Sequence, residues 1–139
     1  MEIVNNAIQT VTTGSNVLFS STAVPGCPSI MHREGSGLVT LRGITTQARA
    51  RFRVTFGANI AIPAEQDIVP ISLAIGLNGE PMLETTMTVT PAAANEYFNV
   101  SKSLFLDIPT GCCSQLSVKN ISTIPVNVQN ANLIVERVA

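Results

Sequence analysis

The stretch RARFRVTF, Arg49 to Phe56, alternates between two kinds of side chain. Successive side chains of a β-strand point to opposite faces, so this pattern predicts a strand with one apolar and one basic face. The apolar face would consist of Ala50, Phe52, Val54 and Phe56, and the basic face of Arg49, Arg51, Arg53 and Thr55. We expect the apolar face to pack in the core and the arginines to meet water, acidic side chains or another subunit.

Extended segments of this kind recur along the whole chain, because Gly and Pro residues interrupt it at short intervals and leave little room for helices. The pattern predicts strands at residues 16–20, 29–33, 38–42, 48–56, 69–77, 83–90, 96–108 (in one piece or two), 115–120, 126–129 and 132–138. Asn78-Gly79 offers the two positive-φ residues that a type I′ hairpin turn requires. About ten strands at this spacing predict an all-β, two-sheet sandwich.

The domain organisation follows from the length of 139 residues, which is typical of one domain. We expect residues 13–139 to form a single β-sandwich. Residues 1–12 contain apolar residues at helical spacing, but the segment is short for an isolated helix. We therefore expect an N-terminal arm or first strand there.

The composition is poor in charge: 12% of residues are charged and 45% are hydrophobic, against about 25% charged in a typical domain. No apolar run approaches the roughly 20 residues that span a bilayer, so we expect no membrane partner. The apolar surplus instead predicts a homo-oligomer, whose subunits bury it against one another. The net charge of −1 argues against a nucleic-acid partner.

The N-terminus lacks the basic and apolar regions of a signal peptide, so we expect the protein to be made without a leader. Glycosylation sequons occur at Asn99 and Asn120. Such triplets arise by chance and matter in secreted eukaryotic proteins. We assign them no role.

Residues capable of catalysis are few. The one histidine, His32, is interpreted as a surface or hydrogen-bonded structural residue. Cys27, Cys112 and Cys113 are expected to be reduced, packed thiols, and adjacent cysteines rarely both bind one zinc ion. No hydrolase or nucleotide-binding motif is present. We predict that the protein is not an enzyme and has no catalytic residues, cofactor or metal.

The candidate interaction residues are Arg49, Arg51 and Arg53. Their guanidinium groups repel one another, so the row should be screened by water or paired with carboxylates. We name Glu80, Glu84 and Glu96 as candidate partners. Three roles stay open: a solvated face beside such acids, a contact with another subunit or an acidic partner, and a catalytic or phosphate-binding role.

Four motifs occur in an order that is typical of one family. They are ARFRVTFGANIAIP, then ISLAIGLNGEP, then FLDIPTGCCSQLSVKN, and finally NLIVERV. This series, over roughly residues 48–138, resembles bacterial domains of the tumour-necrosis-factor (TNF) and complement-C1q type. The resemblance implies a ten-stranded jelly roll that assembles as a homotrimer, with one sheet of each subunit around the threefold axis.

The whole chain also resembles short proteins encoded in phages and prophages of gut Firmicutes. The resemblance is carried by NNAIQTVTTGSNVLF, GLVTLRG and NANLIVERVA. It implies a structural virion protein that decorates the outer surface of the phage head, with the major capsid protein or another virion protein as partner. The alternative is a C1q-like surface-binding module on a spore or cell, although no collagen-like stalk and no cation ligands of the animal members can be matched.

Overall fold

A computed structural model describes residues 1–139 and contains twelve β-strands and one short 3-10 helix. The elements are β1 (Glu2–Asn5), β2 (Gln9–Val11), β3 (Ser21–Val24), β4 (Ile30–His32), β5 (Val39–Arg42), β6 (Arg49–Ala61), β7 (Ile71–Leu77), β8 (Glu80–Pro81), η1 (Leu83–Thr85), β9 (Met87–Val89), β10 (Phe98–Pro109), β11 (Cys113–Asn120) and β12 (Val126–Arg137). No helix is long and apolar enough to cross a membrane.

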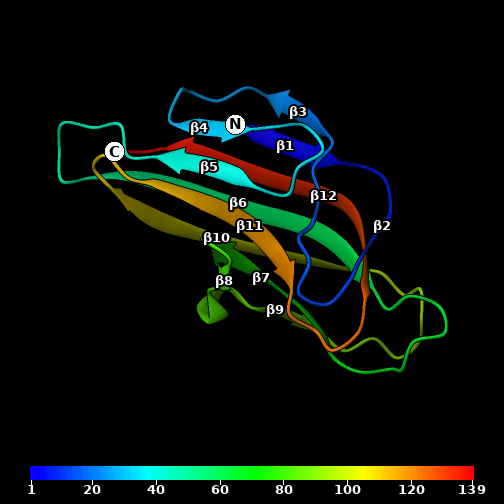
Figure 1. Cartoon of the computed structure of the whole chain (residues 1–139). Coiled ribbons are helices and arrows are strands. Elements are labelled where there is room, and N and C mark those ends of the chain that lie inside the picture. Colours follow the sequence, from blue (N-terminus) through cyan, green and yellow to red (C-terminus); the bar gives the residue numbers. More distant parts are fainter.

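The strands form two antiparallel sheets of six strands each. Sheet A has the order β10-β6-β12-β1-β3, with β2 also paired to β12. Sheet B has the order β4-β5-β11-β7-β8, with β9 also paired to β7. Figure 1 shows the long strands β6, β10 and β12 running along the molecule. The fold is an all-β two-sheet sandwich, as the spacing of strands and turns predicted, and it has the jelly-roll form that the resemblance to TNF and C1q domains implied.

The core lies between the two sheets and contains 29 buried hydrophobic residues. In β6, every second residue from Ala50 to Ile60 points into this core and is at most 2% exposed. The accessible surface of 6798 Å² is close to the roughly 6,900 Å² expected for a monomeric chain of this mass. A single chain therefore closes its own core.

Two turns show why particular residues are needed. Asn78 (φ 53°) and Gly79 (φ 86°) both have positive φ and join β7 to β8, which confirms the predicted turn. Gly43, just after β5, donates its N–H to the carbonyl of Cys112 over 2.8 Å. A Cβ at Gly43 would collide with the carbonyl oxygen of Pro109, so only glycine lets the β10–β11 turn approach this closely.

Several predicted boundaries were wrong. The segment 16–20 makes only an isolated bridge from Asn16 to Lys119, and the strand follows it at Ser21–Val24. Residues 83–90 contain η1 before β9, because the hydroxyl of Thr85 bonds to the carbonyl of Met82 and bends the chain. The strand predicted at 96–108 is unbroken but begins two residues later, as β10 (Phe98–Pro109).

The two strands predicted at 126–129 and 132–138 are one strand, β12. Its pairing with β6 is irregular between Gln129 and Asn132, and Asn130 there has a φ of 54°. An irregularity of this kind kinks a strand without ending it. At the N-terminus, β1 pairs with both β12 and β3 inside sheet A. Residues 1–12 therefore contribute strands to the sandwich.

Candidate functional site

The arginine row lies on the outer face of sheet A, at the end where β6 begins. Asp107 of β10 stands opposite Arg51, and Glu136 of β12 stands opposite Arg53. Arg51 donates Nε to Asp107 Oδ1 over 2.8 Å and Nη2 to Oδ2 over 3.1 Å. Arg49 Nε lies 3.0 Å from the same carboxylate, and Arg53 Nη1 lies 3.7 Å from Glu136 Oε1. Two arginines thus share one carboxylate.

The carboxylates that pair with the arginines are not the candidates Glu80, Glu84 and Glu96. Glu80 lies in β8 and Glu84 in η1, both at the β7 edge of sheet B. Glu96 lies in the loop before β10 and accepts a hydrogen bond from the N–H of Ala92. Strand register decides which acids face the row, because directly opposite side chains of neighbouring strands are the ones that meet.

The ion pairs change the acidity of both partners. The hydrogen bond from Arg51, above all, lowers the pKa of Asp107 below its usual value, and the charge of Arg49 acts in the same direction. The hydrogen bond to Asp107 raises the pKa of Arg51. Both groups are exposed to solvent, so the pairs contribute little to stability. Their effect is to hold the guanidinium groups in place.

A shallow cleft of about 360 Å³ lies beside these pairs. It is lined by Gln47, Ala48, Arg49, Arg51 and Ala139. Arg49 engages the chain only through Nε, and Arg51 only through Nε and Nη2. Because a guanidinium has five N–H donors, both arginines keep donors that can reach a group placed in the cleft.

Apolar side chains also occur on the outer face of sheet A. Phe105 of β10 stands opposite Arg53 and is 64% exposed, and Ile134 of β12 stands opposite Thr55 and is 38% exposed. Arg53 and Thr55 of β6 lie between them, and the hydroxyl of Thr55 is 3.1 Å from that of Ser103. Sequence reasoning did not single out Phe105, although it occupies an outward position in the alternating run from Leu104 to Ile108.

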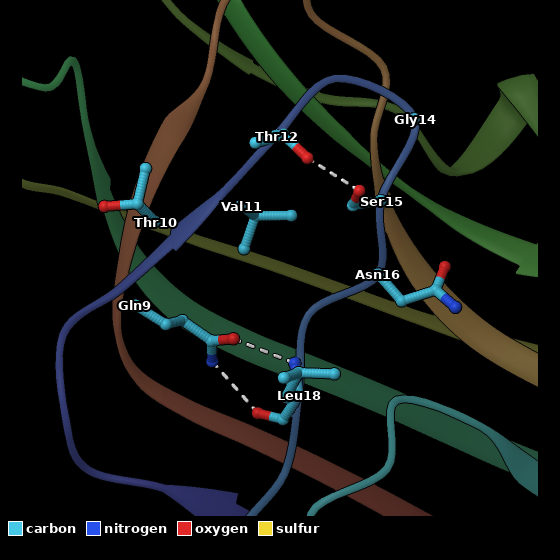
Figure 2. A pocket seen from close by; sticks show the side chains of 8 residues that line it. All are labelled: Gln9, Thr10, Val11, Thr12, Gly14, Ser15, Asn16 and Leu18. Carbon is cyan, nitrogen blue, oxygen red and sulfur yellow. Dashed lines mark hydrogen bonds between the residues drawn. The ribbon is translucent and has the colours of Figure 1, made fainter.

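A larger pocket near the N-terminus uses most of its polar groups internally, although the buried Oδ1 of Asn16, which lines it, has no hydrogen-bond partner (Figure 2). The amide of Gln9 donates to the carbonyl of Leu18 and accepts from its N–H, both over 2.9 Å. Thr12 and Ser15 join their hydroxyls over 2.7 Å. These bonds fasten the segment between β2 and β3.

His32 and the three cysteines, the other residues considered for catalysis or metal binding, do not form a common site. His32 Nε2 lies 2.8 Å from the carbonyl of Ser36, and its ring lies edge-on to Phe19, which fits a structural role. The three cysteines are free, as expected, but all three are exposed, so the expectation of packed thiols was wrong. No three His, Cys, Asp or Glu side chains are grouped to hold a metal ion.

The sequon at Asn120 has a structural explanation. Asn120 is fully buried and donates Nδ2 to the carbonyls of Val11 and Ile124, over 2.9 and 3.0 Å. Its Oδ1 accepts the N–H of Ser122 over 2.8 Å. The side chain thereby joins three segments, and its amide nitrogen is not accessible in the fold.

Comparisons with known proteins support the fold. No protein-family model matches the sequence, and no curated protein matches it. The globular domain of the zebrafish complement 1qA protein is similar in structure, with a TM-score of 0.64 at 10% identity, over 96% of this chain and 93% of that domain. A family 35 carbohydrate-binding module from Clostridium thermocellum has a TM-score of 0.36 at 10% identity, over 96% and 91% of the two chains, which is too distant to support an inference. The chain therefore has a C1q-like and TNF-like jelly-roll fold.

Proposed function

We propose that the protein is a non-enzymatic structural component that assembles as a homotrimer through the outer face of sheet A. The observation that carries the proposal is Phe105, which is 64% exposed on that face with Ile134 nearby. Large aromatic side chains in such positions are typical of the centre of protein interfaces. The threefold arrangement is the one implied by the resemblance to TNF and C1q domains.

The dimensions of the face are sufficient for such an interface. Sheet A is five strands wide along its main path, and β6 contains 13 residues. With about 4.8 Å between strands and about 3.3 Å per residue, the face covers about 800 Å². This is about the area that each partner buries in a standard protein interface.

We further propose that the trimer decorates the outer surface of a phage head, bound to the major capsid protein or another virion protein. The support is the resemblance to short phage and prophage proteins. A small β-sandwich could also stabilise a capsid simply by binding to its surface, without any catalysed reaction. Cosedimentation of the purified protein with phage heads tests this step. A trimer that does not bind heads would favour the alternative, a surface-binding module on a spore or cell.

The mass of the protein in solution tests the assembly. We expect three times the subunit mass of 14.7 kDa in sedimentation equilibrium at micromolar concentration. The double variant Phe105→Ser/Ile134→Ser should be monomeric and folded. Leu83→Ser, which removes a residue 72% exposed outside this face, is the control and should stay trimeric. A monomeric wild type, or equal loss of assembly in the control, would contradict the proposal.

A further inference from the structure

Basic residues are concentrated at one end of the sandwich. Five of the eight basic residues lie where β6 and β11 begin and where β5 and β12 end, namely Arg42, Arg49, Arg51, Arg53 and Arg137. Hydrogen bonds connect the segments at this end. Arg137 Nη1 donates to the carbonyl of Ile44 over 2.9 Å, and the N–H of Gly43 donates to the carbonyl of Cys112. Two acidic side chains at this arginine end, Asp107 and Glu136, form ion pairs with the arginines.

The opposite end carries the reverse charge. Residues 54–101 contain no Lys or Arg. The loops that follow β6 and precede β10 meet through a 2.8 Å bond from Asn95 N–H to the carbonyl of Ile62. They carry Glu65, Asp67 and Glu96, which are exposed and make no ion pair. Figure 1 shows these loops at the end of the molecule away from the C-terminus. The chain is nearly neutral as a whole but strongly polarised.

The cleft at the arginine end has the charge and the restrained side chains that favour binding of an anionic group. Arg49 and Arg51 line it, and Asp107 already restrains both guanidinium groups. Binding a second carboxylate would therefore immobilise fewer side chains than binding to free arginines. Exposed apolar residues accompany the charges, since Ile44 is 48% and Val138 is 44% exposed. Arginine beside apolar side chains is the composition of a protein interface.

We propose that the arginine end is a docking site for an acidic protein surface, with a partner carboxylate bound in the cleft between Arg49 and Arg51. Five arginines, three of them already paired with acids, give too little positive charge for the many phosphate contacts of a nucleic acid. This inference rests on the proposed function and deepens it by naming the surface that attaches to the partner. It requires that the trimer contacts around Phe105 and Ile134 leave uncovered the rim of the face where the cleft opens toward Gln47 and Ala139. Rotation about a threefold axis brings the same end of each subunit to one axial level, so three clefts would bind together.

The test uses a fluorescein-labelled peptide of eight glutamates, with eight glutamines as the uncharged probe, and fluorescence anisotropy at 50 mM NaCl. Wild type should bind the glutamate peptide and not the glutamine peptide. Arg49→Ala/Arg51→Ala should raise Kd about 10-fold or more. The matched control Arg33→Ala/Lys102→Ala, which removes two basic residues outside this end, should change Kd less than about 2-fold.

Several results would overturn the inference. Equal weakening by the two double variants would show that binding depends on overall charge alone. Tighter binding of duplex DNA than of the glutamate peptide would identify a different ligand. Growth of the assembly beyond a trimer that Glu65→Gln/Asp67→Asn/Glu96→Gln abolishes would show that the arginine end binds the acidic end of another copy.

Sedimentation equilibrium of the same samples measures the oligomeric state, so the trimer and the docking site are tested independently. A monomer that binds the peptide through Arg49 and Arg51 would refute the trimer and retain the docking site. A trimer that binds no peptide would retain the assembly and refute the docking site.

Discussion

The two faces of β6 differ although they belong to one strand. The inner face is almost completely buried and consists of Ala50, Phe52, Val54, Phe56, Ala58 and Ile60. The outer face makes polar pairs with its neighbours, such as Arg51 with Asp107, Thr55 with Ser103, and Asn59 with Asn99 at 3.1 Å. The inner face stabilises the subunit, whereas the outer face is left available for contacts with other molecules.

This difference has a physical cause. Burial of apolar area contributes about 25 cal/mol per Å², so the inner side chains contribute most of the favourable free energy of folding. Exposed ion pairs and hydroxyl pairs contribute little, because water competes for them. Substitutions on the outer face should therefore alter assembly and docking while leaving the fold intact.

The largest effect is expected for Phe56→Ala. Phe56 is fully buried and lies edge-on to Phe19, with ring centroids 6.4 Å apart. Its truncation should lower the free energy of unfolding by about 3–5 kcal/mol, measured by urea denaturation of dilute, monomeric protein. Phe105→Ala makes the same chemical change on the outer face and should cost less than about 0.5 kcal/mol. Equal costs would mean that the two faces do not differ in this way.

A smaller effect is expected for Asn120→Ala. The change leaves the buried carbonyls of Val11 and Ile124 without their donor, which should cost about 1–3 kcal/mol. Asn99→Ala is the exposed counterpart, because it removes a bond to Asn59 on the outer face. Thermal unfolding followed by circular dichroism should show a clear decrease in Tm for the first variant and almost none for the second. The reverse order would contradict the comparison.

Gly57→Ala should change stability by less than about 1 kcal/mol, and in the stabilising direction. Gly57 lies on the outer face of β6, and the nearest atom to a new Cβ would be the carbonyl oxygen of Val100 at 3.9 Å. The methyl group therefore fits, and alanine loses less conformational entropy than glycine on folding. Marked destabilisation of the monomer would show that this face is packed within the subunit.

The smallest effect is expected for Asp107→Asn, and it should depend on pH. Because the folded protein holds the pKa of Asp107 below its usual value near 3.8, ionised Asp107 stabilises the fold above that pH. The stability difference between wild type and variant should be present from neutral pH down to about pH 4 and vanish as the pH falls further. Urea denaturation curves between pH 7 and pH 2 measure it. A difference that persists at pH 2 would exclude this ion pair as its cause.

The strand pattern of β6 could be predicted, because alternation of side chains is a local property of an extended chain. The turn at Asn78-Gly79 was predictable for a similar reason, since its residues tolerate positive φ. The partners of the arginines were not predictable. Asp107 and Glu136 face the row only through the registers of β10 and β12, and both strands are distant in sequence.

By itself, the sequence determined the all-β class, the buried face of β6 and the positions of several turns. These depend on the preferences of neighbouring residues and on the separation of apolar from polar side chains along one strand. Only the tertiary structure decided that Arg49 and Arg51 share one carboxylate, that Phe105 is exposed beside them, and that acidic and basic residues gather at opposite ends. Such features depend on how strands far apart in the chain are paired, which local preferences do not specify.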